Sequence, residues 1–154
     1  MQVLKSIASE FGGQVDIVLF GVDASAPEFQ VLPHDFAWTN AGMLTPPQMA
    51  LLLNEADVFV DFSQYQAMGL TALEAMACGV AVVVPEAGGA ESFAVHERNA
   101  LFVDTADAGA CHQALRRLVT DHDLRQALQR QASVDVAAHV PERPAALLLE
   151  ALFG

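Results

Sequence analysis

The residues of this chain with the clearest chemical potential lie in one segment, residues 63–79, which reads Ser-Gln-Tyr-Gln-Ala-Met-Gly-Leu-Thr-Ala-Leu-Glu-Ala-Met-Ala-Cys-Gly. A short apolar run at residues 58–60 ends just before the segment, and a second run at residues 80–85 begins just after it. This order predicts a strand, a polar loop, a helix that starts at Gly69, and a second strand. Because the first turn of a helix presents unpaired N–H groups and the positive end of the helix dipole, it can hold a phosphate group.

The segment resembles the signature of the retaining, GT-B-type glycosyltransferases of family 4, also called group 1. Their pattern runs Ser-x-x-Glu-Gly-Phe-Gly-Leu-x-x-x-Glu-Ala-Met-Ala-x-Gly, followed by a valine-rich strand and a Gly-Gly turn. The residues that match it are Ser63, Gly69, Leu70, Glu74, Ala75, Met76, Ala77, Gly79, Gly88 and Gly89. Gln66 and Ala67 depart from the pattern, where the family usually has Glu and Gly. The resemblance runs from about Lys5 to Asp107 and is weak beyond it.

In that family the segment binds the donor, a nucleotide-sugar, and the resemblance implies a role for each matching position. The backbone N–H groups of Gly69 and Leu70 would contact the diphosphate, and the hydroxyl of Thr71 could join them. The carboxylate of Glu74 would accept hydrogen bonds from the ribose hydroxyls of the nucleotide. Gln66 would contact a hydroxyl of the transferred sugar through its amide, which keeps one acceptor and adds a donor.

Two loops outside this segment complete the predicted donor site. The resemblance places Met43 and Leu44 beside the nucleotide base, although either could equally be an ordinary apolar residue of the core or surface. Gly88 and Gly89 follow the next strand and would form a tight turn that shapes the crevice. Glu91 would belong to the same turn, one residue earlier than the acid of the family pattern.

Simpler structural explanations stay open for the key residues. Thr71 and Glu74 fit the Ser/Thr-x-x-Glu capping box, and spacing alone favours that explanation. Gly69 on its own could be an ordinary glycine at a strand-to-helix turn. Gln66 could mark a site that has lost its function.

Length, composition and charge restrict the class of protein. The chain has 154 residues, of which 53% are hydrophobic and only 17% are charged, so it can bury the core of one folded domain. No apolar run approaches the roughly 20 residues of a membrane span, and the N-terminus does not read as a secretory signal. The net charge of −12 argues against a nucleic-acid partner.

Cysteine and histidine usage argues against a metal site. Cys78 and Cys111 lack metal-ligand spacing, which suggests a reduced, cytoplasmic protein without a disulfide framework; the inner face of a membrane is an alternative location. The histidines show no metal-binding pattern with Cys or carboxylates, and they are His34, His96, His112, His122 and His139. We therefore expect no metal ion and no cofactor, with the nucleotide-sugar as substrate.

The charge distribution raises a difficulty for a diphosphate ligand. Before Arg98 the only Lys or Arg is Lys5. Family members usually supply an Arg and a Lys from a Gly-Arg … Lys-Gly segment upstream, so we expect residues 1–154 to be a donor-binding fragment that lacks the N-terminal acceptor domain. Its first strand is also expected to be absent, because residues 1–11 already read as a helix. The later arginines are expected on a solvated helix face, with a partner domain or a membrane surface as alternatives; they are Arg116, Arg117, Arg125 and Arg130.

Strands alternate with helices along the chain, and the strands are continuous apolar runs. This pattern predicts an α/β fold with a Rossmann-like, doubly wound parallel sheet, here the C-terminal half of a GT-B fold. Expected helices cover residues 1–11, 46–55, 70–78, 106–120, 122–137 and 141–153. Expected strands cover residues 15–20, 36–38, 57–61, 80–84 and 100–103, with a loop at 21–33. Since ligands bind beyond the carboxyl ends of parallel strands, residues 63–69 and 86–91 should line one crevice.

The resemblance implies the donor-binding half of a retaining transferase, which moves a sugar from a nucleotide-sugar to an acceptor such as a polysaccharide or lipid-linked glycan. Glu74 would then bind substrate rather than transfer a proton, and the fragment alone would be inactive. One alternative is a non-catalytic Rossmann-like module of polysaccharide assembly, which Gln66 and the scarcity of cations favour. A flavodoxin-like regulator is a third possibility, but it leaves the Gly69…Glu74…Gly79 pattern unexplained.

Overall fold

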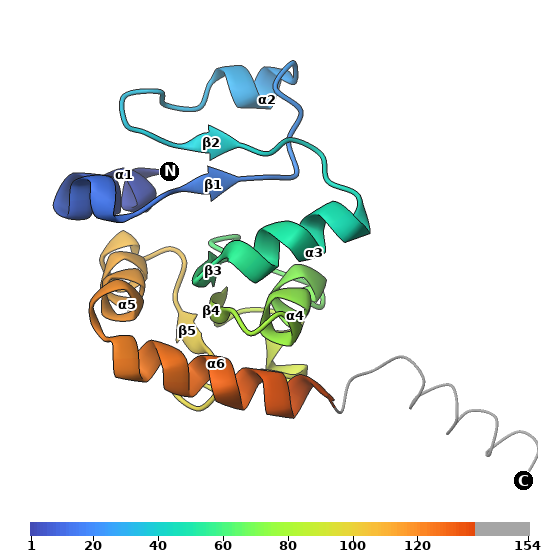
Figure 1. The fold of residues 1–154 in the computed structure, drawn as a ribbon. Helices are drawn as coiled ribbons and strands as arrows, with labels where there is room; N and C mark the ends of the chain where they lie inside the picture. Colours follow the sequence, from blue (N-terminus) through green and yellow to red (C-terminus); the bar gives the residue numbers. More distant parts are fainter. Residues whose placement is uncertain (138–154) are drawn as a thin grey trace, which may run out of the picture.

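The computed structural model describes residues 1–137 as two parallel sheets with helices packed around them (Figure 1). The smaller sheet pairs β1 (Val18–Leu19) with β2 (Thr39–Asn40). The larger one has the order β3-β4-β5, formed by Val58–Val60, Ala81–Pro85 and Leu101–Val103. All pairings are parallel. The predicted Rossmann-like α/β fold is confirmed.

Helices separate the strands along the chain. The α-helices are α1 (Gln2–Phe11), α2 (Pro27–Gln30), α3 (Pro46–Glu55), α4 (Leu70–Ala77), α5 (Ala108–Thr120) and α6 (His122–Val136). Two short 3₁₀ turns are η1 (Gly12–Gln14) and η2 (Gly89–Ser92). Figure 1 shows α1 and α2 beside the two-stranded sheet, with α4, α5 and α6 around the three-stranded sheet. None of the helices in this described part is long and apolar enough to cross a membrane.

Local sequence signals explain where several helices begin. Thr45 precedes α3, and Gln48 Oε1 accepts a hydrogen bond from the Thr45 amide at 2.9 Å, while proline occupies the first helical position. Asp107 caps α5 by accepting from the amides of Gly109 and Ala110. These residues satisfy backbone donors that have no partner inside the helix.

The core lies on both faces of β4, whose five residues are all buried. Val82 and Val84 pack on one face with Met76 of α4 and Ala132 of α6. Val83 packs on the other face with Leu118 of α5. Coverage of both faces is the reason that this strand is apolar at every position.

The structure corrects three expectations about local elements. The expected loop at 21–33 contains the short helix α2, and the strand expected at 15–20 is paired only at β1. The strand expected at 36–38 lies instead at β2, because Trp38 is held by its neighbours: its indole N–H donates to the Pro33 carbonyl at 2.9 Å and its ring stacks on His34. The expected helix at 141–153 lies outside the described residues, as does His139.

Candidate functional site

The loops that follow β3 and β4 meet at the carboxyl edge of the three-stranded sheet. The amide of Gly89 donates to the carbonyl oxygen of Gln66 at 2.8 Å. Gln66 and Gly88 also form an isolated parallel bridge. The two segments predicted to lie together, residues 63–69 and 86–91, are therefore joined backbone to backbone.

Glycine is required at both positions of the second loop. A Cβ atom at residue 88 would lie 2.2 Å from the carbonyl oxygen of Gln66, and Gly88 has a φ of 128°. A Cβ atom at residue 89 would lie 2.2 Å from the carbonyl oxygen of Ala67. Such distances are far inside van der Waals contact, so any larger residue would force the loops apart. Close backbone approach is thus the physical reason for glycine at residues 88 and 89.

Gly69 forms the start of α4. Its φ of 74° and ψ of 41° are left-handed, and it is the N-cap residue with no side-chain cap at this helix end. The first intrahelical bond runs from the Leu73 amide to the Gly69 carbonyl at 3.1 Å. The amides of Leu70 and Thr71 precede that bond, so they are placed to donate to an external acceptor.

The position of Gly69 rules out one of the two explanations of Glu74. Because the helix begins at Leu70, Thr71 is its second residue and cannot be its N-cap. The capping-box alternative is therefore wrong. Glu74 is exposed on α4, and within residues 1–137 it makes no ion pair or side-chain hydrogen bond. Its carboxylate is free to accept hydrogen bonds from a ligand.

The remaining predicted residues are spread around this centre. Gln66 is half-buried and its side-chain amide makes no hydrogen bond within the described part of the chain. Glu91 is exposed in the first turn of η2. Met43 and Leu44 follow β2, at the carboxyl end of the smaller sheet, where Met43 is 69% exposed and Leu44 is half-buried.

Three residues of the motif loop were not assigned a role from the sequence. Tyr65, at 70% exposed, and Met68 are large apolar side chains presented to solvent beside Leu70, which is 58% exposed. The available signal in the sequence was Tyr65, the single aromatic residue between Ser63 and Gly79. Ser63 has a buried Oγ with no partner in the described residues, while its carbonyl accepts from Thr105 Oγ1 at 2.8 Å.

The cations of the described chain are engaged away from this centre. The pairs are Lys5–Asp35, Arg98–Asp135, Arg116–Glu10, Arg117–Glu97 and Arg125–Asp57, and Arg130 donates to Gln126. As expected, the later arginines on a solvated helix face include Arg116, Arg117 and Arg130, which are exposed on α5 and α6. Three of the four also form ion pairs, with α1 or with neighbouring loops. The start of α4 offers backbone amides without a lysine or arginine from residues 1–137.

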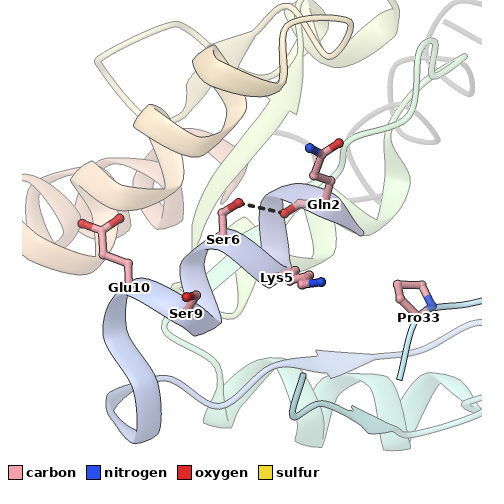
Figure 2. Close-up of a pocket in the computed structure, with 6 residues that line it drawn as sticks. All are labelled: Gln2, Lys5, Ser6, Ser9, Glu10 and Pro33. Carbon is pink, nitrogen blue, oxygen red and sulfur yellow. Dashed lines mark hydrogen bonds between the residues drawn. The ribbon is translucent and has the colours of Figure 1, made fainter. Parts of the chain in front are cut away.

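An open pocket lies elsewhere on the molecule. It is lined by one face of α1 together with the loop after α2, namely Gln2, Lys5, Ser6, Ser9, Glu10 and Pro33 (Figure 2). In Figure 2 the Ser6 hydroxyl donates to the carbonyl of Gln2 within the same helix, at 3.1 Å. No motif residue lines this pocket. Within residues 1–137 no group of three His, Cys, Asp or Glu side chains is arranged to hold a metal ion.

Comparison with known proteins assigns the region that contains the motif to a protein family. The family model for glycosyl transferases group 1 matches residues 39–135. A D-inositol 3-phosphate glycosyltransferase from Pseudarthrobacter chlorophenolicus is 36% identical over 107 residues, which are 70% of this chain and 26% of that protein. The chain thus spans about a quarter of the length of the curated relatives that it matches.

Solved structures show the same fold. HepE from Anabaena, in complex with UDP and glucose, superposes with a TM-score of 0.75 at 18% identity, over 96% of this chain and 44% of that one. TarM superposes with a TM-score of 0.81 at 18% identity, over 99% of this chain and 31% of that one. At this identity the likeness concerns the fold, the Rossmann-like half of a GT-B glycosyltransferase.

Proposed function

The chain belongs to the group 1 glycosyltransferases, and on that basis we propose that it is the C-terminal, donor-binding domain of a retaining, family 4 enzyme. The enzyme would transfer a sugar, of the hexose class, from a nucleotide-sugar to an acceptor such as a polysaccharide or a lipid-linked glycan. The observation that carries the proposal is the uncapped start of α4 at Gly69, placed beside the exposed carboxylate of Glu74. A relative of the same fold holds UDP and glucose.

Each part of the donor has a counterpart in this arrangement. The amides of Gly69 and Leu70, with the hydroxyl of Thr71, bind the diphosphate at the positive end of the helix dipole. Glu74 accepts from the ribose hydroxyls, and Gln66 contacts the transferred sugar. Met43 and Leu44 flank the base, and Gly88, Gly89 and Glu91 shape the wall of the crevice.

The proposed chemistry depends on electrostatic stabilisation of the leaving nucleotide diphosphate. Negative charge grows on the diphosphate as its bond to the sugar breaks, and fixed amide dipoles at the start of α4 stabilise that charge without rearrangement. Because the cations of residues 1–137 are engaged elsewhere, the enzyme needs further positive charge from outside this part of the chain. No metal ion is part of the proposal.

The split sheet supports the proposal that the domain contains one more strand. The carbonyls of Ile17 and Leu19 accept from β2, so the backbone groups of Val18 face the opposite side. Asp57 and Asp61 bond to β4, so those of Val58 and Val60 also face away from their sheet.

The unpaired edges of β1 and β3 contribute side chains to one apolar cluster, which also includes residues of α1. Its members in or beside these two strands are Val15, Ile17, Leu19, Val58 and Val60. A parallel strand between β1 and β3 would join both sheets in the 3-2-1-4-5-6 order of dinucleotide-binding folds. A strand ahead of α1 would also complete a right-handed crossover into β1.

A titration of the 154-residue chain with UDP, ADP and GDP tests the proposed function. Calorimetry should show weak binding, with a dissociation constant above 1 μM, because one helix end without a cation should supply less than about 8 kcal/mol. Submicromolar binding would contradict the proposed need for further positive charge.

The alternative function, a non-catalytic module of polysaccharide assembly, is favoured by Gln66 and by the absence of a cation at the motif among the described residues. It predicts no binding of any of the three nucleotides at millimolar concentration. It also predicts no transfer by the complete gene product with any donor, whereas the enzyme predicts turnover that depends on Glu74.

A further inference from the structure

Among the side chains that the structure describes, Asn99 is the one polar side chain that is buried, with 1% of its surface exposed. It lies in the turn between η2 and β5, outside the donor site described above. A buried amide is costly unless its donors and acceptor are all used. The hydrogen-bond partners of Asn99 therefore indicate its structural role.

The side chain of Asn99 joins two parts of the fold. Its Oδ1 accepts from the amide of Val95 at 2.7 Å. Its Nδ2 donates to the carbonyl of Phe93 at 3.2 Å and to Oδ2 of Asp135, on α6, at 2.8 Å. One side chain thus ties the segment after η2 to a helix that packs behind the sheet.

Several neighbouring side chains hold the Asp135 carboxylate in place. Burial opposes its ionisation, but the hydrogen bonds from Gln131 and Asn99 and the charge of Arg98 outweigh burial and lower its pKa below the ordinary value. Gln131 Nε2 donates to Oδ1 at 2.8 Å, and an Arg98 guanidinium nitrogen lies 3.0 Å from the same oxygen. The carboxylate is therefore charged and held from several sides when it accepts from Asn99.

Phe93, whose carbonyl accepts a hydrogen bond from Asn99, also lies next to the start of α4. It is 5% exposed, and its ring atom Cζ lies 3.5 Å from the point where a Cβ atom of residue 69 would stand. The Cβ atom of Ala90 lies 4.0 Å from the same point. The ring therefore forms the support behind Gly69, the left-handed residue that begins α4.

We propose that Asn99 is a positioning residue of the donor site: anchored on Asp135, it holds Phe93 against Gly69 and so fixes the start of α4. The nature of the ligand, a nucleotide diphosphate, rests on the proposed function, whereas the positioning of Gly69 does not. Backbone amides bind phosphate well only where the first turn is held in place by its supporting residues. Asn99 supplies that support without touching the ligand.

Hydrogen exchange tests the link without any ligand. The Leu73 amide reports the position of Gly69, to whose carbonyl it donates, and the Cys111 amide reports the start of α5, to which Asn99 makes no hydrogen bond. Asn99→Ala should accelerate exchange at Leu73 by about tenfold and leave Cys111 unchanged, because it leaves buried polar groups unpaired beside Phe93. Unchanged exchange at Leu73, or equal acceleration at both amides, would overturn the proposal.

A matched control removes a different bond to the same carboxylate. Gln131→Ala deletes a donor to Asp135 but leaves the bonds of Asn99 to Phe93 and Val95 in place. It should leave exchange at Leu73 unchanged. An acceleration as large as that of Asn99→Ala would show that any weakening of α6 has this effect.

A double variant separates the two arms of the link and applies even where the alanine variant folds poorly. Asn99→Asp with Asp135→Asn exchanges donor and acceptor, so the bond to α6 is kept while the bond to the Phe93 carbonyl is lost. Thermal stability should recover relative to Asn99→Asp alone, while exchange at Leu73 stays fast. Recovery of Leu73 as well would overturn the role of Phe93.

Measurement of UDP affinity tests whether Asn99 affects the donor site. Asn99→Ala should weaken UDP binding by about tenfold, since the amides of the first turn are no longer fixed. Failure of the unaltered chain to bind UDP would remove the proposed function, while the exchange data would still decide whether Asn99 positions Gly69. Unchanged UDP affinity together with faster exchange at Leu73 would overturn the link to the donor site.

Discussion

The amide of Gly89 and the carbonyl of Gln66 lie 2.8 Å apart and join the loops that follow two neighbouring strands. Gln66 belongs to the loop that leads into α4, and Gly89 begins η2. The bond places the sugar-contacting position proposed for Gln66 beside the glycine turn. The backbone of one loop therefore sets the position of a side chain in the other.

Alanine at residue 88 or 89 should destabilise the fold. Either Cβ atom would lie 2.2 Å from a carbonyl oxygen of the facing loop, so Gly88→Ala and Gly89→Ala should each cost on the order of 3 kcal/mol. Gly13→Ala is the control, because no atom lies within 4 Å of its added Cβ. Urea unfolding of the three variants would measure the difference, and equal stabilities would show that the loops can separate freely.

Glu74→Ala should weaken nucleotide binding without weakening the fold. Loss of a charged acceptor leaves ribose hydroxyls unpaired, at a cost of about 2–3 kcal/mol in UDP affinity, and Glu74→Gln should cost less. Glu55→Ala, at an exposed glutamate of α3, is the matched control and should leave binding unchanged. A fall in melting temperature with unchanged UDP affinity would give Glu74 a structural role instead.

Gln66→Glu should change the ranking of donor sugars. A carboxylate removes an N–H donor and adds charge, so sugars with a hydroxyl at the contacted carbon should gain over deoxy-sugars by roughly tenfold. Affinity for the nucleotide diphosphate alone should stay nearly constant. The measurement is kcat/KM of the complete gene product across several donors; a uniform change without reordering would place Gln66 outside the sugar site.

The free energy of unfolding should decrease in acid, and protonation of Asp135 should contribute to that decrease. Its pKa is lower in the folded state than in the unfolded chain, so its contribution is complete above the unfolded value of about 4 and is lost as the pH falls through the folded value. Asp135→Asn should therefore be less sensitive to acid than the unaltered chain in urea unfolding. Asp23, Asp35 and Glu97 also have lowered pKa values, but they contribute equally to both proteins. Parallel pH profiles would remove Asp135 from the account.

Much of the three-stranded half could be predicted from the sequence. The runs around Val58–Val60 and Ala81–Pro85 are apolar at every position because both faces are covered, and Gly69 and Gly79 bound the helix between them. The helix expected at residues 46–55 is also observed with the same bounds, as α3. Each of these signals comes from residues that are close together in the chain, so it can be recognised in the sequence without knowledge of the fold.

What the sequence could not show depends on partners far along the chain. Trp38 was expected in a strand, but its hydrogen bond to Pro33 and its stacking on His34 shift the strand toward β2. The sequence contains no sign of the role of Asn99, because its anchor Asp135 lies 36 positions away. Excluding a capping box formed by Thr71 and Glu74 needed the backbone angles of Gly69.

The central claim is that the start of α4 with Glu74 binds the nucleotide of the donor, and amide NMR during a UDP titration tests it most directly. Shift changes should gather at Gly69, Leu70, Thr71 and Gly89, and Glu74→Ala should remove them at the same UDP concentration. Changes that gather instead around Lys5 and Ser9, in the open pocket of Figure 2, would contradict the account. So would a spectrum that UDP leaves unchanged at millimolar concentration.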